Sequence, residues 1–191
     1  MYCKEKETLP HNPWKTLSTR TVYENSWIRV REDQVIRPDG RPGIYGVVET
    51  PIATGVVALT HDKQVYLVGQ YRYPTNHYSW EIVEGGVAGS ETPLEAARRE
   101  LKEEAGLAAG RWLQLGDVIH LSNCFSAEVG YLYLATSIEE VGADPEGTEV
   151  LTLRKVPFEE CLALVDNGEI KDAVSIIGLL RAERFLRGAN R

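Results

Sequence analysis

The stretch that decides the fold is GGVAGSETPLEAARRELKEEAGL, residues 85–107, a glycine-containing loop that leads into a predicted helix. Thr92 and Glu95 form a T-x-x-E capping box, and Pro93 suits the first helical position. Gly106 suits the C-terminal stop. The spacing therefore predicts a helix over about residues 93–105. Its apolar stripe, which we expect to pack on a sheet, comprises Leu94, Ala97, Leu101 and Ala105.

Three acids, Glu100, Glu103 and Glu104, fall together on an arc beside this stripe. Carboxylates at i and i+4 repel each other by roughly a few tenths of a kcal/mol. The arrangement is therefore either a solvated charged face or a site for a cation, because hard cations prefer carboxylate oxygens. Taken alone, the mixed signs of RRELKEE favour the solvated face.

Strand patterns surround this helix. Before it, residues 21–49 are strand-like, as TVYENSWIRVREDQVIR and IYGVVE around the turn PDGRPG, which predicts a hairpin-like entry. TGVVALTHDKQVYLVGQYRYP adds two apolar strands around HDKQ. After the helix, RWLQLGDVIHL, GYLYLAT and TEVLTLRKVP predict further strands, with LSNCFSAEV and EEVGADPEG as loops.

Two helices are expected to finish the chain. The first begins near PFEECLALVDNG, and the second follows Asp172 as its N-cap. We expect the second helix to bury the side formed by Ala173, Ile176, Ile177, Leu180 and Phe185.

Composition limits the class of protein. A chain of 191 residues with 43% hydrophobic content suits one main domain, and its net charge of −7 argues against a general nucleic-acid binder. The N-terminal sequence has no apolar signal region, and no apolar run has membrane-spanning length, so we expect a cytoplasmic protein with no membrane partner. The three cysteines lie far apart without a CxxC pair, which predicts reduced thiols and no zinc site.

The quoted stretch also matches a known motif. It fits the Nudix box at each defined position, which are Gly85, Glu91, Arg99-Glu100-Leu101, Glu103-Glu104 and Gly106-Leu107. The chain therefore resembles a Nudix hydrolase, and this complete spacing reverses the preference for a solvated face. The resemblance implies an α/β/α sandwich with a mixed β-sheet, and metal-dependent cleavage of a diphosphate.

The resemblance also implies roles for the matching residues. Glu100 and Glu104 are the strongest expected ligands of Mg²⁺ or Mn²⁺, and a backbone carbonyl near Gly85 completes the shell. Glu103 is expected to bind the metal or to position water. Arg99 would orient the carboxylates, so we group it with Glu103 as catalytic.

The general base in this fold often comes from a loop outside the box. Glu128, in FSAE, matches the acidic end of the corresponding loop in several relatives and is the first choice. Glu146 and Glu149 are its rivals, because a base must reach the attacking water. Glu91 is expected to brace the loop by ion pairing.

The stretch before the box, VGQYRYPTNHYSWEIVEGG, resembles that of ADP-ribose pyrophosphatases and related nucleoside diphosphate sugar hydrolases. By this resemblance Arg72 contacts a phosphate or holds the wall of the site, and Tyr71 or Tyr73 stacks on a base. The alternative is a buried aromatic strand with a surface arginine. EIVEGG replaces the common E-L-P-A-G, and LSNCFSAEVG replaces a proline-glycine loop. We therefore expect a broader substrate range that includes ADP-ribose, ADP-glucose and GDP-mannose.

We expect residues 1–50 to form an N-terminal β segment that serves as the dimerisation arm of a homodimer, and residues 51–191 to form the Nudix domain. Two alternatives to nucleotide-sugar hydrolysis stay open. One is a house-cleaning pyrophosphatase for dinucleoside polyphosphates, coenzymes or oxidised nucleotides. The other is a non-catalytic module that binds a nucleotide sugar.

Overall fold

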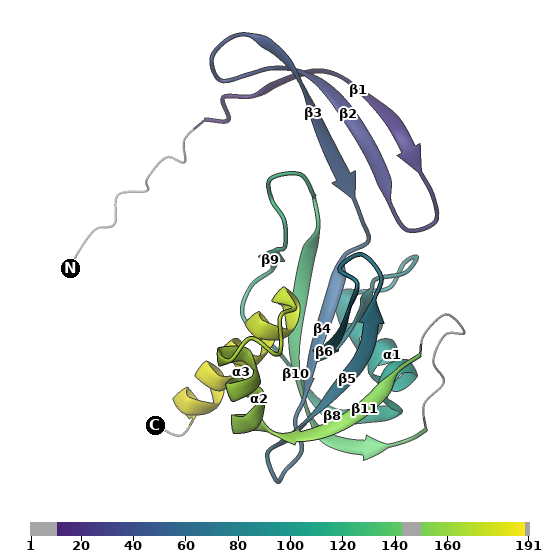
Figure 1. Ribbon diagram of the computed structural model, residues 1–191, viewed down its shortest axis with the longest axis vertical. Helices are drawn as coiled ribbons and strands as arrows, with labels where there is room; N and C mark the ends of the chain where they lie inside the picture. The colour runs from purple at the N-terminus through teal and green to yellow at the C-terminus, as the bar shows by residue number, and fades with distance from the viewer. Residues whose placement is uncertain (1–10, 143–149, 190–191) are drawn as a thin grey trace, which may run out of the picture. The chain divides into compact units, whose positions relative to one another are not determined.

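The computed structural model describes residues 11–142 and 150–189 (Figure 1). Its contacts divide the chain into two units. One contains Met1–Thr50 with Cys124–Ala127, and the other contains Pro51–Asn123 with Glu128–Arg191. We describe each unit by itself.

The first unit is an antiparallel sheet of β1 (Lys15–Glu24), β2 (Arg29–Ile36) and β3 (Pro42–Glu49). The expected hairpin around PDGRPG is confirmed as the antiparallel pair β2–β3. The run before it was expected as one strand, but it contains parts of two, β1 and β2. The side-chain oxygen of Asn25 accepts hydrogen bonds from the backbone N–H groups of Trp27 (2.8 Å) and Ile28 (2.9 Å), which closes the missed turn. Asparagine commonly makes such turns. Residues 124–127 join this unit through a parallel bridge between Ser126 and Val48.

The second unit contains two sheets, built from the strands that follow β3 in the chain. They are β4 (Ala53–Ala58), β5 (Gln64–Arg72), β6 (His77–Glu81), β7 (Val83–Gly86), β8 (Leu107–Gln114), β9 (Ile119–His120), β10 (Val129–Glu140) and β11 (Thr152–Pro157). One sheet has the order β7-β4-β10-β8, with β9 paired to β10, and the other has the order β11-β5-β6. The first is mixed, because β4 and β10 are parallel and its other pairs are antiparallel.

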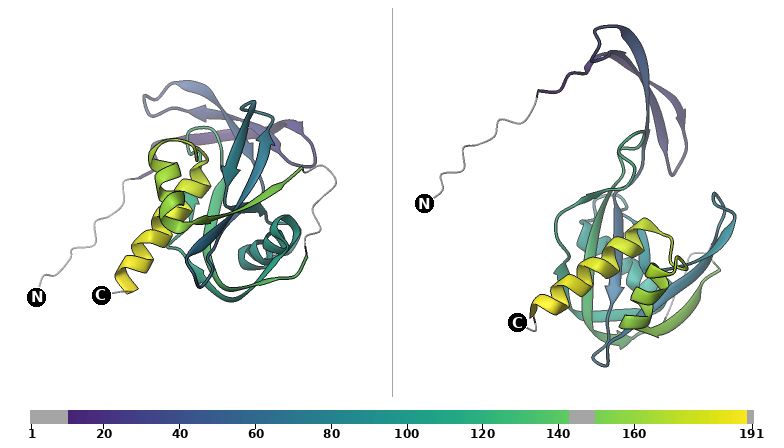
Figure 2. Two further views of the ribbon diagram at one scale, coloured as in Figure 1. Left: turned by 60° about the horizontal axis from the view of Figure 1, so that its bottom comes forward. Right: turned by 60° about the vertical axis from the view of Figure 1, so that its left-hand side comes forward.

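Helices cover both sides of these strands (Figure 2). On one side α1 (Pro93–Ala105) buries its apolar stripe in a cluster that includes Val56 and Val83. On the other, α2 (Phe158–Asp166) and α3 (Ala173–Ala189) pack in a separate cluster with Leu132. The expected α/β/α sandwich with a mixed sheet is thus confirmed, and so are all three helices.

The expected buried side of α3 is only partly correct. Ile176 and Ile177 are partly buried against the core, but Ala173, Leu180 and Phe185 are exposed. The fully buried apolar residues of α3 are instead Val174, Leu179 and Ala182. Small residues explain the difference. A Cβ added at Gly178 would lie 2.9 Å from the Ile82 side chain, so this face of the helix lies closest to the sheet.

Both ends of α1 have the predicted caps. The Thr92 hydroxyl accepts a hydrogen bond from the Glu95 backbone N–H (3.3 Å), and the Thr92 N–H donates to the Glu95 carboxylate (2.7 Å). Gly106 has φ 66°, a left-handed conformation that favours glycine. The sequence alone was therefore sufficient to locate the limits of the helix that carries the acids.

Replacing Thr92 with alanine should lower the free energy of unfolding by about 1 kcal/mol, because the hydroxyl cap is lost. Urea denaturation would measure the change. Ser90→Ala, in the same loop but not at the cap, should change stability by less than about 0.5 kcal/mol. Equal losses in the two variants would contradict the capping role.

Two smaller findings concern the sequence expectations. No helix within the described ranges is long and apolar enough to cross a membrane. Of the cysteines, Cys124 is exposed and Cys161 is buried. Burial raises the pKa of Cys161 to about 12, so that thiol is unreactive.

Candidate active site

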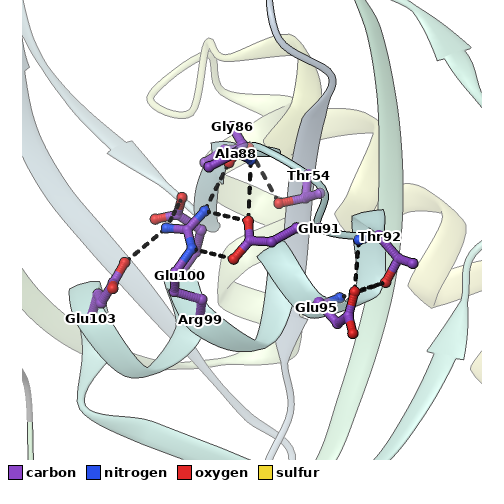
Figure 3. A network of polar contacts seen from close by, with 10 residues as sticks. Thr54, Gly86, Ala88, Glu91, Thr92, Glu95, Arg99, Glu100 and Glu103 are labelled. Atoms are coloured by element: carbon purple, nitrogen blue, oxygen red, sulfur yellow. Dashed lines mark hydrogen bonds and ion pairs between the residues drawn. The ribbon is translucent and has the colours of Figure 1, made fainter.

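Arg99 lies at the centre of the loop and helix that make up the box (Figure 3). Its Nη1 donates to one carboxylate oxygen of Glu100 and one of Glu103, both at 2.8 Å. Its Nε donates to Glu91 at 2.9 Å, and its Nη2 donates to the Gly86 carbonyl at 2.9 Å. One guanidinium therefore ties two helix acids to the loop, which is the orienting position expected for Arg99.

These contacts also fix the charges. The Arg99 guanidinium, together with the Ala88 N–H, holds the pKa of Glu91 below its usual range. The Arg99 pKa is raised, chiefly by its hydrogen bond to Glu91, so Arg99 stays positively charged. Glu91 thus forms the expected ion pair and braces the loop.

Gly85 lies directly against Glu100. A Cβ built on Gly85 would stand 1.9 Å from the carboxyl carbon of Glu100 and 2.0 Å from one of its oxygens. The Glu100 carboxylate therefore occupies the space that any side chain at position 85 would fill. The glycine is required here by this close approach to the backbone.

Glu104 faces the same strand from a buried position. The residue is only 7% exposed, and one of its carboxylate oxygens accepts the Glu84 backbone N–H at 3.2 Å. On the neighbouring strand, the Thr54 hydroxyl donates to the Gly85 carbonyl at 3.2 Å. Strand β7 therefore presents a positioned carbonyl and a positioned N–H beside the acids of α1.

The donor chemistry of this group fits a hard cation. Carboxylate and backbone carbonyl oxygens are the ligands preferred by Mg²⁺. Within residues 11–142 and 150–189, no three His, Cys, Asp or Glu side chains already converge as a metal cluster. Glu100 and Glu103 are instead turned toward the Arg99 guanidinium.

Arg99→Lys should lower kcat/KM by about 10–100-fold, because a lysine has a single ammonium group and cannot reproduce the several guanidinium hydrogen bonds that orient the carboxylates. Steady-state kinetics over a range of Mg²⁺ concentrations would measure this loss. The Mg²⁺ concentration needed for half-maximal activity should also rise. Arg98→Lys is the matched control, since Arg98 lies over the Trp112 ring, 5.8 Å from its centroid. A full retention of activity in Arg99→Lys would contradict the orienting role.

Arg72 lies on β5 and pairs with Glu81. Its Nε donates to the two Glu81 carboxylate oxygens at 3.0 and 3.1 Å, and its Nη2 also contacts Glu81, which is buried. Tyr71 is 59% exposed and Tyr73 is 91% exposed, so the alternative of a buried aromatic strand is wrong for both. Their ring surfaces are open, as stacking on a base requires.

Glu128, the first choice of general base, immediately follows the segment paired with β3 and is partly buried. Burial raises the pKa of Glu128, and the nearby Asp172 adds to this effect. A raised pKa suits a group that exchanges protons near neutral pH. Its rivals Glu146 and Glu149 lie outside the described residues.

The sequence did not reveal the polar contact between α3 and β7. Ser175 is fully buried. Its hydroxyl donates a hydrogen bond to the Glu84 carboxylate at 2.7 Å, and the Ser175 hydroxyl oxygen accepts one from the Ile82 backbone N–H at 3.0 Å. Burial and the neighbouring Asp172 raise the pKa of Glu84 well above its usual range. The unusual EIVEGG was the available signal for Glu84, whereas no local pattern identifies Ser175.

Comparison with known proteins agrees with this geometry. The family model of the NUDIX domain matches residues 49–176, and that of the nucleoside diphosphate sugar hydrolase N-terminal domain matches residues 14–48. An ADP-ribose pyrophosphatase of Mycobacterium tuberculosis is 33% identical over 94% of this chain and 88% of its own length. A GDP-mannose pyrophosphatase of Yersinia pestis is 31% identical over 68% of this chain and 70% of its own.

A solved structure shares the fold. The crystal structure of an ADP compounds hydrolase superposes with a TM-score of 0.83 at 20% identity, covering 96% of this chain and 100% of that one. An ADP-ribose pyrophosphatase of Bacillus subtilis is 28% identical over 83% of this chain and 86% of its own length. The NUDIX family model matches most of the chain, and every defined position of the Nudix box is present. This chain therefore belongs to the Nudix hydrolase family.

Proposed function

We propose that this protein hydrolyses the diphosphate bond of nucleoside diphosphate sugars, giving a nucleoside monophosphate and a sugar phosphate. The observation that carries the proposal is the placement of three α1 acids. Glu100 and Glu103 lie on Arg99, Glu100 also lies against Gly85, and Glu104 is bonded to the backbone of β7. The match to the N-terminal domain of nucleoside diphosphate sugar hydrolases supports the substrate class. The named activities of the relatives point to ADP-ribose and GDP-mannose as the first substrates to test.

Members of the Nudix family generally use divalent metal ions. We propose Mg²⁺ or Mn²⁺, held by Glu100, Glu104, Glu103 and the Gly85 carbonyl. When bound, such an ion neutralises charge on the phosphoryl oxygens and lowers the pKa of a bound water. Arg99 holds the carboxylates of Glu100 and Glu103 in a fixed orientation through its hydrogen bonds.

The remaining chemistry belongs to other side chains. Glu128, or its rivals Glu146 and Glu149, accepts the proton of the attacking water. Arg72 holds the wall of the site through its bond to Glu81, and Tyr71 or Tyr73 stacks on the base. The alternatives differ in products, because a nucleoside triphosphate releases pyrophosphate or phosphate instead of a sugar phosphate. A binding module would release nothing.

The experiment that tests this function is a hydrolysis panel with Mg²⁺, Mn²⁺ or EDTA. It contains ADP-ribose, ADP-glucose, GDP-mannose, diadenosine polyphosphates and nucleoside triphosphates, with products separated by chromatography. We expect metal-dependent release of AMP or GMP with a sugar phosphate. Turnover of triphosphates or dinucleotides alone would overturn the substrate class, and no turnover anywhere would favour the binding module.

We further propose that residues 1–50 form the dimerisation arm of a cytoplasmic homodimer and that residues 51–191 carry the catalytic groups. Every residue of β1 is exposed, and Leu17 and Ile44 are exposed apolar residues of this sheet. Trp27, in the turn between β1 and β2, is 74% exposed. Exposed apolar surface of this extent suits a second copy of the chain.

Light scattering would test the dimer. The wild-type chain should have the mass of a dimer, and Leu17→Ser should shift the population toward monomer. Lys15→Ser, on the same exposed strand, is the matched control and should stay dimeric. A monomeric wild type would overturn the proposal.

A further inference from the structure

Ser175, in the first turn of α3, lies on the other side of β7 from the helix that carries the acids. Side chains alternate between the two sides of a strand. Val83 belongs to the apolar cluster that receives α1, whereas Ile82, just before β7, belongs to the cluster that receives α3. The side chain of Glu84 also faces α3, because its carboxylate accepts the Ser175 hydroxyl at 2.7 Å. Strand β7 therefore has α1 on one side and Ser175 on the other.

A glycine allows the short serine side chain to reach this strand. Gly55 pairs with Glu84 in the sheet, and a Cβ built on Gly55 would lie 2.6 Å from the Val174 side chain. The first turn of α3 is thus closer to the sheet than any side chain at position 55 would permit. At this separation the Ser175 hydroxyl oxygen accepts a hydrogen bond from the Ile82 backbone N–H at 3.0 Å.

The start of α3 fixes the position of Ser175 in turn. The Ser175 N–H donates to the Asp172 carboxylate at 2.7 Å, and the Ile176 N–H donates to the Asp172 carbonyl at 3.0 Å. Bonds of this kind anchor the first turn of a helix. Because Ser175 is fully buried and its hydroxyl both donates and accepts a hydrogen bond, the contact is rigid.

The strand that Ser175 holds also carries groups of the proposed metal site. Strand β7 pairs with β4 at the end of its sheet, so ladder hydrogen bonds hold it from one side. The Glu84 backbone N–H donates to Glu104 on α1 at 3.2 Å. The next residue, Gly85, has the carbonyl that we propose as a ligand. A displacement of β7 would therefore disturb two of the proposed ligands together.

We propose that Ser175 is a positioning residue for the metal site: its hydroxyl holds β7 in place, and with it the Gly85 carbonyl and the bond between Glu84 and Glu104. This inference rests on the proposed function and adds to it a residue outside the Nudix box. Ser175 is sealed behind the strand and acts through Glu84 and the Ile82 N–H. Partners that orient metal ligands in this way typically contribute about 10–100-fold in metal affinity.

A pair of variants isolates the hydroxyl. Ser175→Thr and Ser175→Val have nearly the same shape, and only the first keeps a hydroxyl group. The strain of the added methyl group is common to both, so the difference between them reports the hydroxyl. Ser175→Ala removes the hydroxyl without adding volume. Val174→Ala is the matched control for lost packing, because Val174 is a buried residue of the same turn and its loss leaves the Ser175 hydroxyl in place.

The first readout is Mn²⁺ binding in the absence of substrate, measured by electron paramagnetic resonance of the free ion. Ser175→Ala and Ser175→Val should weaken Mn²⁺ binding about tenfold or more, whereas Ser175→Thr and Val174→Ala should stay within about threefold of wild type. Urea denaturation would show that Val174→Ala loses as much stability as Ser175→Ala. Equal affinities in the Thr and Val variants, an equal loss in Val174→Ala, or no Mn²⁺ binding to wild type would overturn the inference.

The second readout is the Mg²⁺ concentration needed for half-maximal turnover of ADP-ribose. It should rise in Ser175→Ala by about the same factor as the loss of Mn²⁺ affinity, and kcat at saturating Mg²⁺ should largely recover. A loss of kcat that no Mg²⁺ concentration restores would indicate a general structural role instead and would also overturn the inference.

Failure of the proposed function would look different. A wild-type protein that binds Mn²⁺ with the expected dependence on the hydroxyl, yet hydrolyses no nucleotide sugar, would remove the reaction and keep the positioning role. Nucleotide-sugar turnover with equal Mn²⁺ affinity in wild type and Ser175→Ala would do the reverse.

Discussion

Replacing Glu104 with glutamine is expected to abolish most turnover while leaving the fold nearly intact. Glutamine has the same shape, and its side-chain oxygen still accepts the Glu84 N–H that Glu104 accepts at 3.2 Å. What the variant loses is the negative charge of a buried carboxylate that we propose as a metal ligand. Metal ions contribute several kcal/mol to transition-state stabilisation, and each 1.36 kcal/mol is tenfold in rate, so we expect a loss of about a thousandfold in kcat.

Steady-state kinetics with Mg²⁺, together with urea denaturation, would separate the two effects. Glu139→Gln is the matched control, because it changes the net charge equally on an exposed residue of β10. The control should keep wild-type activity and stability. Full activity in Glu104→Gln would remove the metal assignment, and a loss of folding would show that the carboxylate is needed mainly for packing.

The helix that carries this acid was predictable because its determinants are local. The cap at Thr92, the stop at Gly106 and the apolar stripe all lie within one short segment, and the structure has the helix at Pro93–Ala105. Periodicity was less informative for α3, which has apolar residues on several sides. There the choice of buried face depends on which small residues permit close approach to the sheet.

Parts of the site could not be predicted because they depend on residues far apart in the chain. The Ser175 hydroxyl meets Glu84 across 91 positions, and neither residue marks the other in the sequence. The pairing of residues 124–127 with β3 also joins parts that are far apart in the chain. The sequence indicated only a loop for LSNCFSAEV and gave no partner for it. The box located the acids and Arg99, whereas the residues that support them required the fold.

Gly85→Ala is expected to lower kcat/KM about a hundredfold with only a modest loss of stability. The added methyl group would stand 1.9 Å from the Glu100 carboxyl carbon and 2.3 Å from its Cγ. The carboxylate is the end of a flexible side chain, so it would swing away rather than unfold the protein. A displacement of about 1 Å at a reacting centre costs roughly 10²-fold in rate.

Two comparisons make this prediction specific. Gly86→Ala is the matched control, because its new Cβ would meet no atom closer than the Pro51 Cβ at 3.5 Å, an ordinary contact. If Gly85→Ala acts by displacing Glu100, it should cost little further activity when Glu100 is already alanine, since the two changes then remove the same interaction. Kinetics on the two single variants and the double variant would measure this coupling. Additive losses would instead mean that the methyl group acts on the β7 carbonyl or on the substrate itself, and that Glu100 is not the group for which position 85 must be glycine.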